Sequence, residues 1–143
     1  KFALGWKDVS IIAENFHSIR AEIHGRFDIA YAHGVYYHTN SPLHFLDSLT
    51  RLSDNIFIGG WSATDQFHSP WEEWEFEGQK YRGKSYSEPI HFLSGIQNSS
   101  RYLDTDSQIQ FFERRGFKTT ILSHESNQGR VTGEFLRFLA QRT

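Results

Sequence analysis

Cysteine and methionine are both absent from the 143-residue chain. Without cysteine, disulfide bonds and thiolate zinc sites are excluded, and this composition fits the reducing cytoplasm. Because residue 1 is a lysine and no initiator methionine is present, we expect the chain to be a fragment or processed product of a longer protein. No apolar run approaches the roughly 20 residues that a membrane span needs, and no signal peptide opens the chain. The sequence therefore predicts a cytoplasmic protein without membrane contact.

A strong charge of one sign is also lacking. The net charge is −2, and the longest basic run is the pair Arg114-Arg115. Nucleic-acid-binding proteins normally show a basic stripe, because phosphate contacts dominate their affinity. A nucleic-acid partner is therefore unexpected unless folding assembles a basic patch, and a small-molecule substrate is favoured.

Aromatic residues, in contrast, are abundant at 16% of the chain. The hydrophobic fraction of 38% and the charged fraction of 22% are typical of a globular domain, and the length fits one such domain. A Phe-rich core accounts for most of the aromatic rings. The excess predicts that some of them line a pocket or face a partner.

Short strand-like runs alternate with helical patterns along the chain. Apolar residues at Phe16, Ile19 and Ile23 predict a helix that Gly25 ends, and Gly34 ends the strand that follows. Ser41 and Pro42 are typical of a helix start, and leucines recur behind them at helical spacing. Strands are predicted at residues 9–13, 27–32, 55–60, 117–122 and 131–139.

The second half of the chain begins with a long connection, residues 61–103, whose many aromatic residues indicate an ordered insertion or lid. Thr105-Asp106-Ser107-Gln108 matches a capping box with Thr105 as the cap, and Gly116 ends the helix that follows. After a turn at residues 127–129, residues 131–139 form an antiparallel hairpin strand or, alternatively, a terminal helix. The overall alternation predicts an α/β fold with a mostly parallel sheet and an antiparallel C-terminal hairpin.

One segment resembles a known family. Phe27-Asp28-Ile29-Ala30-Tyr31-Ala32-His33-Gly34-Val35-Tyr36-Tyr37-His38, with Ser41-Pro42 and the leucine-rich helix, is similar to the fourth strand and following helix of class I, Rossmann-like S-adenosylmethionine-dependent methyltransferases. Residues 81–86 and the stretch from Arg114 to Phe117 also resemble this family. The Gly-Val-x-Tyr-His form is closest to the branch of the tRNA wobble-uridine carboxymethyltransferases.

The resemblance covers the C-terminal part of the family's domain. The first strands and the Gly-x-Gly-x-Gly loop that binds the cofactor in this family have no counterpart here, so we expect a partial methyltransferase domain over residues 1–143. Removal of those strands would leave an open sheet edge, which predicts self-association or pairing with a missing N-terminal part. Whether these residues bind S-adenosylmethionine alone stays open.

The resemblance also implies cofactor-binding residues. Glu14, Asn15 and Phe16 would lie near the adenine ring, although Asn15 could instead be a helix N-cap. Ala32, His33 and Gly34 would pass near the sulfonium and methyl group, because open α/β sheets bind ligands at the carboxyl ends of their strands. The alternative for this second group is a simple strand-ending turn.

Substrate residues are expected beside them. His38 is the candidate general base, with a structural role as the alternative, and Tyr37 is a candidate substrate contact. Metal binding by the histidines is not expected, because their spacings place them on different faces. The acceptor pocket is predicted to include Trp61, Trp71, Trp74 and Tyr81; these could equally form an aromatic mini-core or a dimer face.

Three functions remain open at this point. The first is methyl transfer from S-adenosylmethionine to a small-molecule acceptor, as part of a longer protein. The second is a non-enzymatic binding or scaffolding module with a degenerate methyltransferase fold. The third is an RNA-modifying methyltransferase, which the Gly-Val-Tyr-Tyr-His motif suggests and the charge balance opposes.

Overall fold

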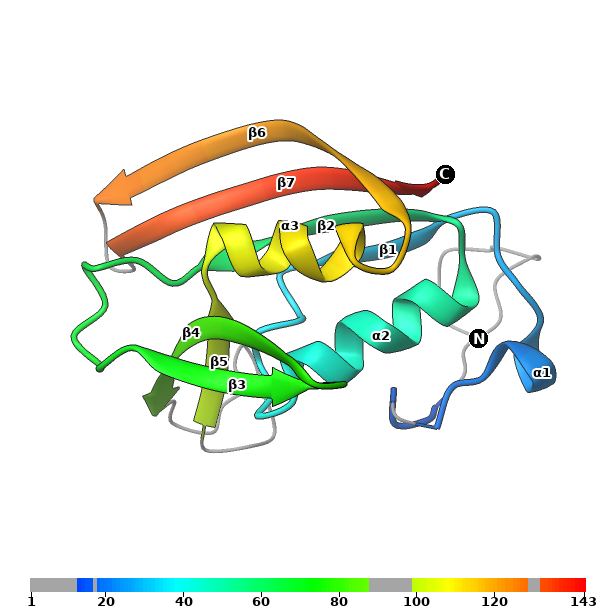
Figure 1. The fold of residues 1–143 in the computed structure, drawn as a ribbon, viewed down its shortest axis with the longest axis horizontal. Helices are drawn as coiled ribbons and strands as arrows, with labels where there is room; N and C mark the ends of the chain where they lie inside the picture. Colours follow the sequence, from blue (N-terminus) through cyan, green and yellow to red (C-terminus); the bar gives the residue numbers. More distant parts are fainter. Residues whose placement is uncertain (1–12, 17, 88–98, 129–131) are drawn as a thin grey trace, which may run out of the picture.

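The computed structural model describes residues 13–16, 18–87, 99–128 and 132–143, which form two sheets and three helices (Figure 1). The first sheet has the strand order β1-β2-β7-β6, and the second has the order β3-β4-β5. The elements are α1 (Ala21–His24), β1 (Ala30–His33), α2 (Pro42–Leu52), β2 (Asn55–Ser62), β3 (Glu72–Phe76), β4 (Gln79–Ser87), β5 (Ser99–Leu103), α3 (Thr105–Glu113), β6 (Phe117–Gln128) and β7 (Thr132–Arg142).

The first sheet combines parallel and antiparallel pairing. β1 and β2 are parallel, with Ala30 opposite Ile56, whereas β7 runs antiparallel to both β2 and β6. This arrangement confirms the predicted α/β class with its antiparallel C-terminal hairpin, and the alternative of a terminal helix is wrong. The predicted strand at residues 9–13 lies outside the described residues except for Ala13, which is not in a strand.

Helices α2 and α3 lie on the same side of the first sheet (Figure 1). Ile56 and Ile58 of β2 are fully buried, as are Leu136 and Phe138 of β7. Helix α2 begins at Pro42, as predicted. Its regularly spaced leucines face the first sheet, so the helix and the sheet share one apolar core.

Two helix starts differ from the prediction. The cap of α3 is Asp104, whose carboxylate accepts a 2.7 Å hydrogen bond from the Ser107 backbone N–H, and Thr105 is the first helical residue. Aspartate and threonine are both good caps, so the pattern was displaced by one residue. The first predicted helix is only the four-residue α1, because the chain before Arg20 forms a turn instead.

The first predicted strand on this sheet is also shorter than expected. β1 begins at Ala30, and Phe27 contributes only an isolated parallel bridge to Ser53. Tyr31 is 67% exposed, and Phe27 and Ile29 are exposed beside it. Since β1 is the outermost strand of its sheet among the described residues, these apolar side chains mark an open edge.

Residues 61–103 contain the second, antiparallel sheet. β3 and β4 are joined by a two-residue turn in which Glu77 and Gly78 have φ angles of 51° and 72°, the positive values that a type I′ hairpin turn requires. β4 pairs with β5, and residues 88–98 between them lie outside the described residues. The aromatic-rich connection is therefore a folded layer in its described part.

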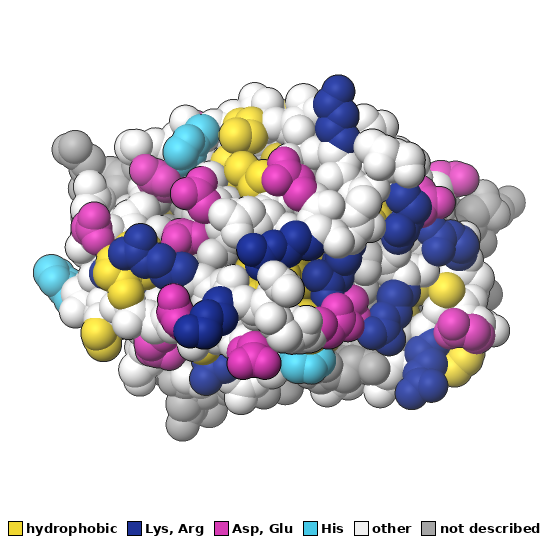
Figure 2. Space-filling view, in the orientation of Figure 1, with side chains coloured by type: hydrophobic (Ala, Val, Ile, Leu, Met, Phe, Trp, Pro, Cys, Tyr) yellow, Lys and Arg dark blue, Asp and Glu magenta, His cyan; other side chains and the backbone are white. Residues whose placement is uncertain are grey.

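Within the described residues, no helix is both long enough and apolar enough to cross a membrane. On the face that carries α2 and α3, Lys and Arg side chains lie among Asp and Glu side chains (Figure 2). Arg115 illustrates this mixing, because its guanidinium lies 2.7 Å from the Glu77 carboxylate and 3.4 Å from that of Asp47.

Candidate functional site

Strand β1 ends at His33, opposite Gly59 of the parallel strand β2, which continues to Ser62. The backbone N–H of Gly34 donates a 2.7 Å hydrogen bond to the Gly59 carbonyl, and Gly34 then turns the chain out of the sheet with φ 71°. A side chain at this φ would be strained, so glycine is the suitable residue here. Open α/β sheets bind ligands at such strand ends, which makes this edge the candidate site.

Gly60 of β2 leaves room for the ring of a buried tyrosine, Tyr36. A Cβ atom at Gly60 would lie 2.4 Å from Tyr36 Cε1, so only glycine leaves room for this ring. The Tyr36 side chain is fully buried, and its hydroxyl donates a 2.7 Å hydrogen bond to the Trp61 carbonyl. Burial, reinforced by Tyr37 and Tyr102, raises the pKa of Tyr36 well above 10. Tyr36 is therefore a neutral hydrogen-bond donor at physiological pH.

Tyr37 lies between Gly60 and Gly34. A Cβ atom at Gly60 would lie 3.0 Å from Tyr37 Cε1, and one at Gly34 would lie 3.9 Å from the Tyr37 hydroxyl, its one neighbour within 4 Å among the described residues. The ring is almost completely buried and stacks on Tyr102, with 4.9 Å between the ring centroids. Its neighbour His38 tilts against it at 4.4 Å. The structure thus brings three of the predicted residues, Gly34, Tyr37 and His38, to one strand end.

The two other predicted residues of β1 point to opposite faces of the sheet. Ala32 is buried on the face that α2 covers, whereas the exposed His33 ring lies over Gly59 on the other face. There His33 lies 5.4 Å from the Phe135 ring, and Trp61 packs on Phe135 edge-on at 5.1 Å. His33 and Trp61 therefore share Phe135 as a neighbour.

The residues predicted to lie near the adenine ring occur in a turn ahead of α1. Asn15 accepts a 2.8 Å backbone hydrogen bond from Ser18 and does not cap a helix, so the helix-cap alternative is wrong. Glu14 lies 3.3 Å from His24, and the Phe16 ring packs on Phe45 of α2 at 5.0 Å. The contact of Phe16 with α2 ties this segment to the helix layer.

Trp71 and Tyr81 both belong to the second sheet region but differ in setting. The Arg82 guanidinium lies 3.8 Å from the centre of the Trp71 ring and the Lys84 ammonium 4.5 Å from it. Lys84 is itself buried and donates a 2.7 Å hydrogen bond to the Phe67 carbonyl. Tyr81 is 1% exposed and packs on Phe111, which fits the packing alternative for this residue.

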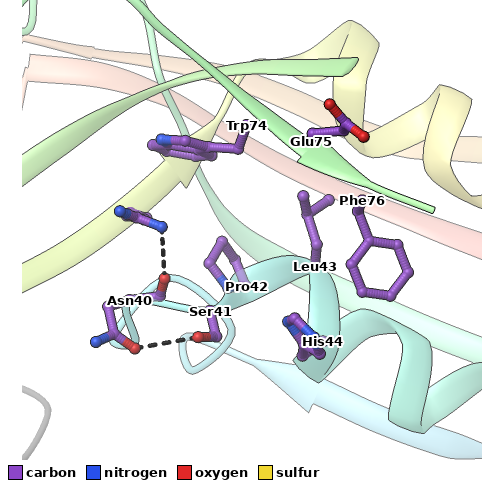
Figure 3. Close-up of a pocket in the computed structure, with 9 residues that line it drawn as sticks. Asn40, Ser41, Pro42, Leu43, His44, Trp74, Glu75 and Phe76 are labelled. Atoms are coloured by element: carbon purple, nitrogen blue, oxygen red, sulfur yellow. Dashed lines mark hydrogen bonds between the residues drawn. The ribbon is translucent and has the colours of Figure 1, made fainter. Parts of the chain in front are cut away.

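Trp74 borders a hollow between β3 and the start of α2. The hollow has a volume of about 100 Å³. Figure 3 shows Trp74 and Phe76 projecting toward the start of α2, whereas the Glu75 carboxylate points away. Arg101 of β5 closes one side, where its guanidinium donates a 2.9 Å hydrogen bond to the Asn40 carbonyl.

The backbone of Arg101 connects this hollow to the tyrosines. Its N–H is shared between the carbonyls of Tyr37 and Thr39, each at 3.1 Å. The loop after β1 is thereby held against the second sheet. In the part of the chain that the structure describes, no three His, Cys, Asp or Glu side chains gather as possible metal ligands.

Sequence reasoning missed the residues whose partners are distant in the chain. Tyr36 needs Gly60, and Tyr37 needs Tyr102, but no local pattern reveals either pair. Arg101 lies at the end of a long connection and carries no motif. The available signal was the pair Gly59-Gly60 within a predicted strand, because glycine within a strand often marks the close approach of another group to the backbone.

Comparison with solved structures identifies similar folds. The N-terminal domain of EvdMO1, crystallised in the presence of S-adenosylhomocysteine (SAH) and D-fucose, aligns with a TM-score of 0.68 and 20% identity over 91% of this chain and 53% of that chain. The Burkholderia thailandensis 1,6-didemethyltoxoflavin-N1-methyltransferase, with bound 1,6-didemethyltoxoflavin and SAH, aligns with a TM-score of 0.55 and 15% identity over 92% of this chain and 50% of that chain.

A third similar structure is the glycopeptide N-methyltransferase MtfA in complex with S-adenosylmethionine, with a TM-score of 0.52 and 11% identity over 92% of this chain and 64% of that chain. The chain thus spans about half of the first two structures. No protein-family model and no curated protein sequence matches it. The chain has the mixed α/β fold found in these SAH- and S-adenosylmethionine-bound proteins, as the sequence predicted.

Proposed function

We propose that the chain is part of an S-adenosylmethionine-dependent methyltransferase that acts on a small-molecule acceptor within a longer protein. The observation that carries this proposal is the end of β1, where, among the described residues, the space beside Gly34 holds only the hydroxyl of a buried tyrosine, Tyr37. The shared fold supports it, because solved structures with this fold hold SAH or S-adenosylmethionine.

The residues at the strand ends fit part of such a cofactor. A backbone without a side chain at Gly34 can approach a ligand closely, and Ala32 and His33 are the last two residues of β1, directly before it. Glu14, Asn15 and Phe16 are the proposed contacts of the adenine ring. When bound, S-adenosylmethionine supplies a methyl group on a sulfonium, which an acceptor atom takes by direct displacement.

The protein's own groups would orient the acceptor. Tyr37, whose hydroxyl would lie 3.9 Å from a Cβ at Gly34, is the proposed side chain that positions the methyl acceptor, and its stack on Tyr102 holds the ring in place. His38, whose ring lies against Tyr37, is the proposed acceptor of the proton that the nucleophile loses. Trp61 and the second sheet with Trp71 and Trp74 are the proposed acceptor walls, and Tyr81 supports them from the core.

Titration calorimetry with SAH tests the proposal. We expect binding by the full-length protein, and Gly34→Val should abolish it because a branched side chain would fill the approach at the end of β1. Gly78→Ala in the β3–β4 turn, where a Cβ would meet none of the described residues within 4 Å, is the control for replacing a positive-φ glycine. Absence of binding by both the chain and the full-length protein would favour the scaffolding module instead.

A methyl-transfer assay then tests the roles of the side chains. We expect Tyr37→Phe and His38→Gln to retain SAH binding but to lower the turnover number, His38→Gln by about 10²-fold if the histidine is the general base. An unchanged rate in His38→Gln would assign this histidine the structural alternative. The mixed charges in Figure 2 oppose the RNA-modifying alternative. Methylation of an RNA substrate by the full-length protein would support that alternative.

The open edge of β1 supports the remaining part of the proposal. Phe27, Ile29 and Tyr31 are exposed there, so the edge can pair with the part of a longer protein that precedes the chain, or with a second copy. Residues 61–103 then remain the proposed lid or insertion over the acceptor. Sedimentation velocity of the isolated chain measures this tendency, and a monomer at all concentrations would argue against an unpaired edge.

A further inference from the structure

A groove lies between the turn that joins β3 to β4 and the C-terminal end of α3. Its volume is about 360 Å³, which falls within the range of small-molecule sites, about 300–1,000 Å³. The residues that line it are Phe76, Glu77, Gln79, Tyr81, Arg114 and Arg115. Gly34, Tyr37 and His38 are not among them, so the groove is separate from the strand end where methyl transfer is proposed.

One of the two arginines of the groove already has its charge neutralised. The Arg115 guanidinium lies 2.7 Å from the Glu77 carboxylate and 3.4 Å from the Asp47 carboxylate. It also lies on the Phe111 ring, 3.9 Å from the ring centre. Arg115 is therefore a fixed part of the wall, where it ties the β3–β4 turn to α2 and α3.

Arg114, in contrast, carries an uncompensated charge. Its side chain is exposed, and in the described ranges it has no carboxylate within 4 Å and no acceptor for its N–H groups. The guanidinium lies 5.3 Å from the centre of the Tyr81 ring, which supports it from one side. A guanidinium is planar and has five N–H donors. A ligand can therefore bind in the guanidinium plane and does not have to enter between this group and the ring.

Two neutral side chains add further donors to the groove. Tyr81 is 1% exposed, and its buried hydroxyl has no hydrogen-bond partner among the described residues. Gln79 is exposed, and its side-chain amide offers two N–H donors. A buried hydroxyl without a partner costs stability, so a ligand group that accepts from Tyr81 would relieve that cost. The groove thus has more donors than acceptors, which favours a ligand rich in acceptor oxygens.

Negative charges beside the groove limit the charge of that ligand. Glu77 lines the groove, and the last carbonyls of α3 form the negative end of the helix dipole. Arg114 balances one negative charge, whereas a second would be repelled. A carboxylate has one charge and two oxygens that match the fork of a guanidinium. A phosphate monoester carries about 1.5–2 negative charges at pH 7, so it fits less well.

We propose that the groove bounded by Gln79, Tyr81 and Arg114 binds the carboxylate group of a small molecule. The carboxylate oxygens accept hydrogen bonds from the Arg114 guanidinium, and Gln79 and Tyr81 supply the further donors. Phe76 adds apolar surface for the remainder of the ligand. Because this site lies apart from the end of β1, the proposal does not depend on the proposed methyl transfer.

Heteronuclear NMR of the full chain, titrated with sodium benzoate at constant ionic strength, tests the proposal. Benzoate carries a carboxylate on a small apolar ring, and benzyl alcohol is its uncharged analogue. We expect benzoate at millimolar concentration to cause saturable shifts of the Arg114 Nε–H signal and of the backbone amides of residues 77–81 and 114–116. Benzyl alcohol should cause no saturable shift.

Three variants locate the binding group. Arg114→Gln removes the charge and should weaken benzoate binding about tenfold, and it should fold because Arg114 is exposed. Arg114→Lys keeps the charge but loses the planar fork, so its loss should be intermediate. Lys118→Gln is the matched control, because Lys118 is an exposed cation of β6 that does not line the groove. The same change in net charge should leave its benzoate binding unchanged.

Several outcomes would overturn the proposal. Shifts that rise with benzoate concentration without saturating would show that no site exists. An equal loss of binding in Arg114→Gln and Lys118→Gln would show a response to net charge alone. Saturation by inorganic phosphate at a lower concentration than benzoate would reject the carboxylate as the ligand group. Shifts of the same amides on addition of SAH would assign the groove to the cofactor.

Discussion

Two adjacent glycines of β2 allow a direct test of how the strand end is built. Alanine at Gly59 would place its Cβ 2.3 Å from the His33 ring, and alanine at Gly60 would place it 2.4 Å from the Tyr36 ring. The two contacts are nearly equal in distance, but their partners differ. His33 is exposed and can rotate toward solvent, whereas Tyr36 is fully buried and its hydroxyl is bonded to the Trp61 carbonyl.

The expected costs follow from this difference. Overpacking of a rigid core costs about 1–3 kcal/mol, and we place Gly60→Ala at the upper end, about 2–3 kcal/mol, because Tyr36 cannot move without losing its hydrogen bond. Gly59→Ala should cost less than about 1 kcal/mol. Both substitutions stabilise by lowering the entropy of the unfolded chain to a similar degree, so the difference between them isolates the rigidity of the partner.

Urea denaturation followed by circular dichroism measures both free energies of unfolding. At the chain's size, a loss of about 2–3 kcal/mol corresponds to a fall in melting temperature of roughly 6–12 °C. Equal losses for the two variants would refute the reasoning, because they would show that Tyr36 yields as readily as an exposed histidine. A larger loss for Gly59→Ala would point to the same conclusion.

Three further outcomes are expected. Asp104→Ala should destabilise the protein by about 1 kcal/mol in the same urea assay, whereas Thr105→Ala should cost little, because only Asp104 caps α3. The hydrogen bond from Arg142 lowers the pKa of Asp54, so the stability that this carboxylate contributes is present above about pH 4 and is lost as the pH falls through the lowered pKa. The free energies of unfolding of the wild type and of Asp54→Asn should therefore converge in acid. A constant difference between the two proteins down to pH 2 would contradict this. In an ultraviolet pH titration, Tyr36 should ionise well above pH 10. If Tyr36→Phe instead removes a tyrosine transition that the wild type shows near or below pH 10, the prediction is wrong.

The sequence predicted the elements whose signals are local. Pro42 at the first helical position and the leucine spacing behind it located α2, and the alternation after Gly116 located β6 and β7. The cap of α3 was misplaced by one residue because Asp104 and Thr105 are chemically similar candidates. The first helix shrank to α1, since three spaced apolar residues alone do not stabilise a helix without a layer to pack on.

The candidate site was predictable only where its residues are consecutive. Gly34, Tyr37 and His38 follow one strand, so a strand and a glycine were enough to place them together. The partners of Tyr37, by contrast, come from β2 and β5. Contacts between residues so far apart in the sequence form only when the sheets assemble. The contact of the Trp74 ring with Gly83 is of the same kind, and no local sequence pattern predicts it.

The sharing of the Arg101 N–H between the carbonyls of Tyr37 and Thr39 has a consequence for how this protein can change. One backbone donor joins β5 to the loop that follows β1, so a one-residue slip of β5 would break both bonds at the same time. Side-chain exchanges on β3 and β4 leave this backbone link in place, whereas an insertion or deletion in β5 would remove it.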